Sequence, residues 1–392
     1  MKTEVDVVIV GGGIMGAATA ATLARRGERV ALLERRQIGH DRGSSHGDGR
    51  IVRLTYAEPD YVAMALRGYD GWRKLERASG EELLVTCGGL DIGPEGHEVV
   101  RSIHEMMREA GVACELLTAS AMTERFPQLR ASESADALFQ PATAVIRAEA
   151  AWRTYVDRAI VDGAEVEEGV EITSMQTGLG VTVEAADGRS WRAERLVLTA
   201  GAWTNKFLTM LDEPTLPLET THEQVAYLSP REAPVSHGPD RLPTVIDYFD
   251  TPLFYSLPRM SAEGSHAGVK IGWHRSGAPV DPDLSPRPPR PEFLQAIAGF
   301  TRRRFHHLDD PPTTVVDCLY TNTPDHHFVL DRLPGSTPIV IGAGFSGHGF
   351  KFAPAVAEVL AALSRDEPTP VPLDSFRLAR FAGATVAPHV GA

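Results

Sequence analysis

The stretch of sequence that most constrains the fold is VDVVIVGGGIMGAATAATLARRGERVALLE, residues 5–34. It opens with a short continuous apolar run, which is typical of a strand buried in a parallel sheet. Three glycines follow directly in the spacing G-x-G-x-x-G: Gly11, Gly13 and Gly16. The next residues are rich in alanine and predict a helix, and residues 30–33 predict a second strand that is followed by Glu34.

Each part of this unit suits the binding of a dinucleotide. Gly11 permits the tight turn, Gly13 lets the backbone approach a pyrophosphate, and Gly16 lets the helix pack closely on the sheet. The helix N-terminus presents amide groups and a positive dipole end to that pyrophosphate. Glu34 can accept hydrogen bonds from the adenosine ribose hydroxyls. The alternative is a glycine-rich turn in an ordinary βαβ unit, and the motif does not distinguish FAD from NAD.

Composition bounds the size of the fold and the class of partner. A chain of 392 residues with 43% hydrophobic content can bury a large core, and its length predicts two domains or three. The formal net charge of −13 argues against nucleic acid or an anionic membrane surface as a partner. It still permits a local positive pocket for a small anion. No apolar run reaches the roughly 18 residues that a membrane span needs.

The N-terminus and the cysteines predict a cytoplasmic protein. Glu4 and Asp6 stand where a signal peptide carries positive charge, and glycines interrupt the apolar run that follows. The three cysteines, Cys87, Cys114 and Cys318, are widely spaced and fit neither a C-x-x-C motif nor a disulfide framework.

Lysine is rare in this chain. Of the 39 basic residues only five are lysines: Lys2, Lys74, Lys206, Lys270 and Lys351. Arginine therefore serves wherever a bare positive charge suffices. Lysines that remain in apolar surroundings are candidates for a function, because arginine replaces a compact ammonium poorly.

The order of predicted elements indicates an α/β fold with two interleaved domains. A strand followed by glycine recurs in RLVLTAGAW, residues 195–203, and again in PIVIGAGFSGHGFKF near residue 340. We therefore expect a Rossmann-like FAD- or NAD-binding domain interleaved with a β-rich (α+β) substrate domain, and a ligand where the two meet. The first would comprise residues 1–80, 146–220 and 321–385, and the second residues 81–145 and 221–320.

Two further segments give specific expectations. Residues 138–145 predict one strand that returns the chain toward the first domain. Residues 293–305 predict a helix, with Arg302, Arg303 and Arg304 on a solvated face.

Three segments carry groups suited to chemistry. The polar loop RRQIGHDRGSSHGDGRIVRLTY after Glu34 is too long and too rich in hydrogen-bonding groups to be plain filler. The glycine-rich turn after residue 341 offers amide donors to an electron-rich group, and Lys351 follows it; the alternative for Lys351 is a surface helix lysine. Taken alone, the sequence around Cys318 predicts an unreactive cysteine that packs in the core. His326 and His327 do not combine with Cys318 into any zinc pattern, so we expect no metal.

Five motifs together resemble the monomeric sarcosine oxidase and N-methyltryptophan oxidase family of FAD-dependent amine oxidases: GGGIMGAA, SSHGDGRIVR, GVKIGWH, DCLYTNTPDHHFVLD and GAGFSGHGFKF. The resemblance runs nearly end to end. It implies FAD attached covalently through Cys318, hydride transfer from a small secondary amino acid, and reoxidation by O2 to hydrogen peroxide. Imine hydrolysis would follow, giving glycine and formaldehyde from sarcosine. The family also implies a monomer.

The resemblance assigns roles residue by residue. It places Lys270 beside the flavin, where an ammonium would assist the reaction with O2, and Arg50 next to it. Arg53 and Lys351 match the groups that hold the substrate carboxylate. The substrate pocket would be lined by Tyr255, His274, Tyr320 and Ile246. For His274 a purely structural role is the alternative, and no general base is assigned.

The remaining cofactor contacts are expected from the motifs and from the resemblance. They come from the first glycine turn, the polar loop, the two later strand ends and the second glycine turn. With Gly11, Gly13, Gly16 and Glu34 they are Ile14, Met15, Arg35, Ser44, Ser45, His46, Arg50, Ile51, Val170, Ala200, Gly201, Trp203, Cys318, Gly344, Phe345, Gly347, His348, Gly349, Phe350 and Lys351.

The chain departs from the family at the loop and in the pocket. Where the family loop often reads HHGDTR, this chain has SHGDGR, so Ser45 and Gly49 depart from the family loop. In the pocket, Ile246 and Tyr248 do not match the sarcosine oxidase pattern. The substrate therefore stays open among sarcosine, N-methyltryptophan, pipecolate and proline-like acids. Two other functions stay open as well: a flavin dehydrogenase with a quinone or protein acceptor, and a flavin-binding module without activity.

Overall fold

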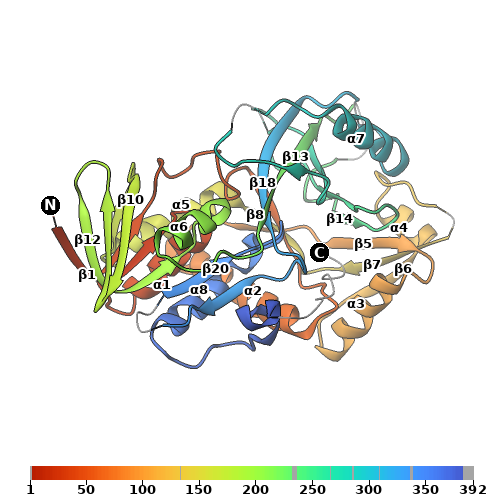
Figure 1. The fold of residues 1–392 in the computed structure, drawn as a ribbon. Coiled ribbons are helices and arrows are strands. Elements are labelled where there is room, and N and C mark those ends of the chain that lie inside the picture. Colours follow the sequence, from red (N-terminus) through yellow and green to blue (C-terminus); the bar gives the residue numbers. More distant parts are fainter. Residues whose placement is uncertain are drawn as a thin grey trace.

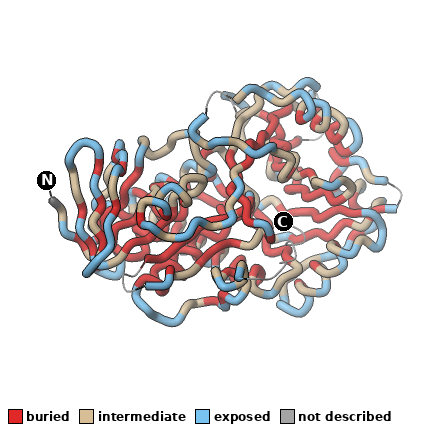
Figure 2. The backbone as a smooth tube through the Cα atoms, in the orientation of Figure 1, coloured by how far each residue is buried: buried red, intermediate tan, exposed pale blue. Residues whose placement is uncertain are grey.

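The computed structural model describes residues 2–132, 134–231, 236–264, 266–284, 287–308, 310–335 and 339–382. Its strands form two large sheets and one small sheet, and Figure 1 shows the two large sheets at opposite ends of an elongated molecule. The buried backbone runs through both ends and across the region where they meet (Figure 2). No helix among the described residues is long and apolar enough to cross a membrane.

The first sheet has eight strands and carries the N-terminal glycine motif. Its order is β10-β11-β12-β1-β2-β9, with β20 also paired to β12 and β19 to β20. The strands β2, β1, β12 and β20 run parallel. The bounds are β1 (Lys2–Val10), β2 (Val30–Leu33), β9 (Glu165–Glu167), β10 (Ile172–Gly178), β11 (Gly180–Ala185), β12 (Ser190–Leu198), β19 (Val329–Arg332) and β20 (Ile339–Ala343).

Apolar side chains are buried on both faces of this sheet, which explains the continuous apolar run of its first strand. Val7 and Ile9 face a core that includes α1 (Ile14–Ala24), α5 (Ala148–Val161) and α8 (Ala353–Ser364). Val8 and Val10 face a second core, covered by β10, β11 and α6 (Thr204–Met210). The helix α2 (Pro59–Ser79) packs beside α8.

The second sheet has nine strands and is mostly antiparallel. Its order is β17-β13-β16-β15-β14-β5-β7-β6, with β18 also paired to β13. The helices α3 (Glu98–Glu109), α4 (Ala119–Arg125) and α7 (Pro291–Arg304) accompany it. The strand bounds are β5 (Gly89–Pro94), β6 (Glu115–Thr118), β7 (Ala135–Gln140), β13 (Glu219–Leu228), β14 (Thr244–Asp247), β15 (Phe254–Leu257), β16 (Val269–Trp273), β17 (Ala278–Pro279) and β18 (Thr314–Asn322).

A small third sheet contains β3 (Gly49–Val52), β4 (Leu84–Thr86) and β8 (Ala144–Arg147), in the order β3-β8-β4. The prediction of one strand over residues 138–145 is wrong, because a turn splits the segment between two sheets: β7 pairs with β5, and β8 pairs with β3. Part of the polar loop thereby becomes a strand.

The helix predicted near residue 293 is present as α7, but one of its arginines is not solvated. Arg304 is only 2% exposed, and its Nε donates to the Oδ2 of buried Asp247 at 2.7 Å. The prediction of a solvated face is wrong for this residue, because Arg304 lies where α7 meets the end of β14. An arginine can be buried there because a carboxylate balances its charge.

Candidate active site

A cavity of about 290 Å³ is lined by residues from both large sheets and from the polar loop. All the residues predicted for the cofactor, the substrate and catalysis line it, with the exception of Gly16. Two segments distant in sequence, the first glycine turn and the turn before Lys351, contribute to the same wall. The cavity lies where the ends of the parallel strands face β15, β16 and β18.

The first glycine turn has the shape that the motif predicts. Gly11 has φ +103°, and a Cβ at this position would lie 2.6 Å from the Thr199 carbonyl oxygen. A Cβ on Gly16 would lie 1.9 Å from the Gly11 carbonyl oxygen, so α1 packs directly against the turn. Gly16 therefore acts behind the cavity wall, through helix packing. Gly13 begins α1 without a side-chain cap, which leaves the helix end facing the cavity.

Glu34 is buried at the end of β2 and lines the cavity. Its Oε2 accepts a hydrogen bond from the Gly12 amide at 2.8 Å, and its Oε1 accepts one from the Arg36 amide at 2.9 Å. Burial opposes its ionisation, but His40 and these amides lower the pKa of Glu34 below its ordinary value. Glu34 is therefore an acceptor, as the binding of a ribose diol requires.

The polar loop closes over the glycine turn. The Ser45 Oγ accepts a hydrogen bond from the Ile14 amide at 3.0 Å, and the Ser44 hydroxyl donates to the Leu319 carbonyl at 2.5 Å. Arg50 donates to the loop carbonyl of His46 at 2.6 Å. These bonds tie the loop to α1 on one side and to β18 on the other.

His46 gives a test of whether FAD fits. It is 8% exposed and lines the cavity, and its Nε2 has no hydrogen-bond partner among the described residues. Burial and the charges of Arg50 and Lys270 lower the pKa of His46 to about 4, so the ring is neutral. An unpartnered buried ring nitrogen, a glycine turn with no side chains and an acidic group at the end of β2 form a donor and acceptor set that fits FAD.

Cys318 lies on β18 within the cavity wall. It is directly opposite Glu223 of β13, so the two side chains are on the same face of the sheet. Burial raises the pKa of the Cys318 thiol above its ordinary value, while the nearby cations Arg50 and Lys270 oppose that effect. The thiol therefore lies beside two positive charges that favour its thiolate.

Lys270 on β16 is buried and has a nearby counter-ion. Its Nζ donates to the Gly49 carbonyl at 2.9 Å and lies 3.7 Å from the Asp48 Oδ1. The Tyr227 hydroxyl donates to the same carboxylate oxygen at 2.5 Å. Burial and the charge of Arg50 lower the pKa of Lys270 to about 8, against the opposing effect of Asp48. Lys270 is therefore an ammonium at neutral pH and titrates in the mildly alkaline range.

Arg53 is held by a buried carboxylate that the sequence did not single out. Its Nη1 donates to the Asp91 Oδ1 at 3.0 Å and to the Thr55 carbonyl at 2.5 Å. The Tyr248 hydroxyl donates to the same Asp91 oxygen at 3.1 Å. Arg53 and Asp91 are 5% and 2% exposed, so this is a buried ion pair.

Lys351 faces the same end of the cavity without an ion pair to any described carboxylate. Its Nζ donates to the Tyr56 hydroxyl at 2.8 Å and to the His348 carbonyl at 2.9 Å. Burial and the neighbouring charge of Arg53 lower the pKa of Lys351 well below its ordinary value. An anion bound here would supply the missing counter-charge. Lys351 is 8% exposed, so it is not a surface helix lysine.

The register of the second sheet explains which of its residues line the pocket. Asp91, Ile246, Tyr255 and Gly272 are direct neighbours on adjacent strands, so their side chains share one face. A Cβ on Gly272 would lie 2.3 Å from the Tyr255 Cζ, so only glycine leaves room for that ring. Next to it, the His274 Nδ1 lies 3.2 Å from the Tyr320 hydroxyl oxygen.

Sequence reasoning missed two buried acids at this site, Asp91 and Glu223. Asp91 offered a signal, because it interrupts the apolar strand GGLDIGP and a buried acid requires a partner. Glu223 gave none, since it lies within a run of polar residues, TTHEQ at 220–224. Among the residues that the structure describes, no group of three or more His, Cys, Asp or Glu side chains is arranged to hold a metal ion.

Comparison with known proteins identifies the family. The family model described as DAO, FAD dependent oxidoreductase, matches residues 6–363. The chain is similar to the peroxisomal sarcosine oxidase of Homo sapiens, with 36% identity over 96% of each chain. It is also similar to the monomeric sarcosine oxidase of Bacillus sp. (strain B-0618), with 32% identity over 93% of each chain.

Solved structures agree with this assignment. The structure of NikD, an unusual amino acid oxidase essential for nikkomycin biosynthesis, superposes with a TM-score of 0.83 at 25% identity, covering 96% of this chain and 97% of that one. The resemblance to the sarcosine oxidase group and the expected α/β fold are both confirmed. The chain therefore belongs to the DAO family of FAD-dependent oxidoreductases and is an FAD-dependent amino acid oxidase.

Proposed function

We propose that this enzyme oxidises a small secondary amino acid, with sarcosine as the leading substrate. The observation that carries the proposal is the Lys351 Nζ, which is buried near Arg53 in the cavity without a carboxylate partner among the described residues. A small carboxylate there would gain a charge-assisted hydrogen bond in a water-poor site. The relatives named sarcosine oxidases direct the proposal to an N-methyl amino acid.

The chain's residues would orient this substrate. Lys351 and Arg53 bind its carboxylate, which fixes the position of the amine. Tyr255, Tyr320 and His274 line the pocket and exclude water from the reacting carbon. When bound, FAD supplies the hydride acceptor, and its reoxidation by O2 gives hydrogen peroxide. The oxidised substrate is an imine, and water hydrolyses it to glycine and formaldehyde when the substrate is sarcosine.

Lys270 would act on oxygen. Its ammonium, paired loosely with Asp48, stabilises the negative charge that develops as dioxygen is reduced. Arg50 adds a second positive charge near Cys318. We assign no general base from the residues predicted by sequence.

The proposal includes covalent attachment of FAD through the Cys318 sulfur. Support comes from the position of the thiol in the cavity wall, where Arg50 and Lys270 favour the thiolate. In purified protein we expect the yellow colour to stay with the chain after acid precipitation. Replacing Cys318 by alanine should release it into the supernatant. The proposal also takes the enzyme as a cytoplasmic monomer, since none of its three cysteines forms a disulfide and the Bacillus relative is named monomeric.

The deciding experiment is an anaerobic screen of secondary amino acids for bleaching of the flavin absorbance, followed by admission of air and assay of peroxide. We expect sarcosine to bleach the flavin and air to restore the colour with one peroxide per cycle. Bleaching without peroxide, but with reduction of an added dye, would identify a dehydrogenase. If no secondary amino acid bleaches the flavin, the proposed function is wrong.

A further inference from the structure

A second cavity, of about 530 Å³, adjoins the first. It is lined by the start of β13, by the turn that follows β16, and by the end of β18 with the turn after it. Glu223 lines both cavities and therefore stands in the wall between them. The exposed Glu219 also lines it.

Glu223 is a buried carboxylate that forms no ion pair within the described part of the chain. It is 3% exposed, and its hydrogen bonds come from neutral groups: the Thr221 hydroxyl at 2.7 Å and the Gly277 amide at 3.1 Å. Burial raises the pKa of Glu223 above its ordinary value. Buried charges in proteins are normally paired, yet the cations whose charges reach Glu223, Arg275 and Arg290, form no ion pair with it.

Arg275 is the matching cation in the same cavity. It has φ +56°, in the left-handed region, and its Nη2 and Nε donate only long hydrogen bonds of 3.3 and 3.4 Å to the Ser346 carbonyl. No described carboxylate forms an ion pair with it, and burial lowers its pKa to about 10. Beside it, the Asn322 Nδ2 donates to Thr221 at 3.1 Å, while the buried Asn322 Oδ1 has no partner among the described residues.

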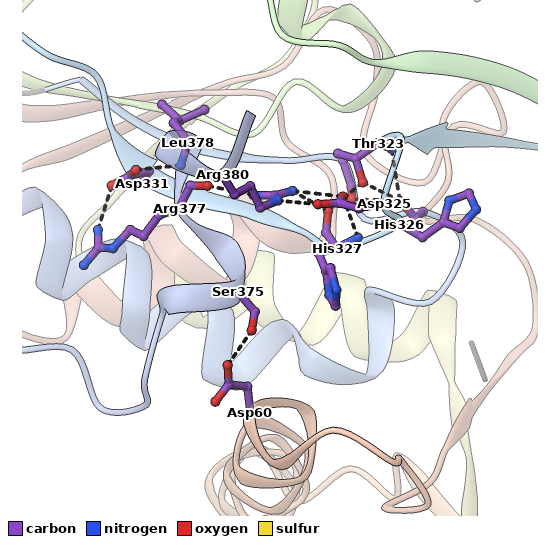
Figure 3. A network of polar contacts seen from close by, with 12 residues as sticks. Asp60, Thr323, Asp325, His326, His327, Asp331, Ser375, Arg377, Leu378 and Arg380 are labelled. Carbon is purple, nitrogen blue, oxygen red and sulfur yellow. Dashed lines mark hydrogen bonds and ion pairs between the residues drawn. The ribbon is translucent and has the colours of Figure 1, made fainter. Parts of the chain in front are cut away.

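The turn after β18, which contributes to the cavity wall, is hydrogen-bonded to the C-terminal segment. His326, which lines the cavity, belongs to the turn after β18, and the buried Asp325 accepts hydrogen bonds from Arg380 at 2.6 and 3.3 Å. Figure 3 shows Arg380 and Asp325 facing each other while the His326 ring points away from them. Within the turn the Thr323 hydroxyl donates to the His327 carbonyl at 2.7 Å. The cavity thus contains a buried acid, Glu223, and a half-buried cation, Arg275, and neither forms an ion pair within the described residues.

We propose that the second cavity binds the amino acid substrate in its zwitterionic form, with Arg275 holding the carboxylate and Glu223 with the Asn322 Oδ1 holding the ammonium. The proposal rests on the proposed function, because it takes the substrate to be an amino acid. In water an amino acid carries both charges, so a site with one unpaired cation and one unpaired anion is complementary to it. Occupancy places the substrate next to the inner cavity before it reaches Lys351.

A zwitterion that cannot be oxidised makes the test independent of turnover. 2-Aminoisobutyrate is such a probe, since its α-carbon bears no hydrogen. Equilibrium dialysis of the purified holoenzyme against radiolabelled 2-aminoisobutyrate should give two bound equivalents per chain. Arg275→Met and Glu223→Gln should each weaken one of these equivalents at least tenfold, and Arg275→Lys should retain it. Pivalate, which has a methyl group in place of the ammonium, should compete poorly for that equivalent.

Controls separate this proposal from the proposed function. Arg241→Met removes an exposed arginine and should leave both equivalents unchanged, and circular dichroism checks that each variant is folded. The flavin spectrum reports the inner cavity alone. Suppose that only one equivalent binds, that Arg275→Met does not affect it, and that sarcosine still bleaches the flavin. This result would overturn the second site only. Two equivalents in protein that no secondary amino acid bleaches would keep the site and reject the proposed substrate.

Discussion

The two buried lysines of the active site differ in what balances their charge. Lys270 has Asp48 at 3.7 Å, and its pKa is lowered only to about 8. Lys351 has a hydroxyl and a carbonyl as partners, and burial and the neighbouring charge of Arg53 lower its pKa well below the ordinary value. Lys270 therefore has a counter-ion within the protein, whereas the counter-charge for Lys351 has to come from a ligand.

This difference separates two tasks. A charge that must be present before dioxygen arrives needs its own counter-ion, because neutral dioxygen brings none. A charge that binds a carboxylate gains most when nothing else competes for it, since the ligand then supplies the compensation. Arg53 shows the intermediate case, because Asp91 already balances it. We expect Lys351 to be the stronger of the two carboxylate ligands.

Removing the uncompensated lysine should have the largest effect. In Lys351→Met the substrate carboxylate loses a buried charged partner, at a cost of about 2–5 kcal/mol, or roughly 30-fold to several thousandfold in affinity. The measurement is the sarcosine concentration that half-saturates anaerobic flavin bleaching. Lys74→Met, which removes an exposed lysine, is the matched control. An unchanged half-saturation in Lys351→Met would mean that the carboxylate binds elsewhere.

Removing the compensated lysine should affect the other half of the cycle. Lys270→Met should slow reoxidation of the reduced enzyme by about 100- to 1,000-fold, the usual effect of removing one preorganised charge-stabilising group. Reduction by the amino acid should change only a few-fold. Stopped-flow mixing of the reduced enzyme with O2 measures the first rate and anaerobic mixing the second. Full oxygen reactivity in this variant would refute the role given to Lys270.

Removing the charge of Asp91 should make Arg53 resemble Lys351, which has no counter-ion. Asp91→Asn keeps an acceptor for Arg53 and Tyr248 but removes the negative charge. We expect a carboxylate such as pivalate to bind about tenfold more tightly, because Arg53 then attracts it fully. The melting temperature should fall, since a buried ion pair is broken. Tyr248→Phe, which removes one hydrogen bond and no charge, should have a smaller effect. Weaker binding in Asp91→Asn would instead mean that its charge is needed to aim Arg53.

A change in pH should have the smallest effect on the reoxidation rate and on stability. In its proposed role Lys270 acts as the ammonium, so the reoxidation rate should fall as pH rises through about 8, and Lys270→Arg should abolish that decrease. Stability changes in the opposite direction. Because the folded pKa lies below that of an unfolded lysine, the unfolded chain binds more protons above pH 8, and this group makes folding more favourable as pH rises from about 8 to about 10.4. Melting temperatures of wild type and Lys270→Met across this range check the sign.

The parts of the site that are local in sequence could be predicted, and those that depend on strand neighbours could not. The glycine turn, α1 and Glu34 follow one another within residues 5–34, so spacing alone identifies them. Cys318, Lys270 and Lys351 could be assigned because their surrounding motifs resemble a family. Residues 53 and 91 meet only through packing between distant strands, and no pattern in the chain specifies which strands are neighbours.

The split of residues 138–145 between two sheets has a similar cause. The turn after β7 holds a Thr143 hydroxyl bonded to Gln140, and both side chains are buried. Two short strands joined by a tight turn look like one longer strand in the sequence. The buried Arg304 was mispredicted for a related reason, because Asp247 is 57 positions away.

The contacts of the C-terminal segment can form only late in synthesis. Arg380 binds Asp325 and so fastens the turn beside the second cavity, while Arg377 binds Asp331 on β19 (Figure 3). During synthesis every residue that faces the cofactor emerges from the ribosome before these two arginines do. A product that stops at residue 373 would therefore hold a full set of flavin ligands and could colour yellow, while the turn beside Arg275 lacked its brace. Colour alone would then overstate how much of a preparation is competent to take up substrate.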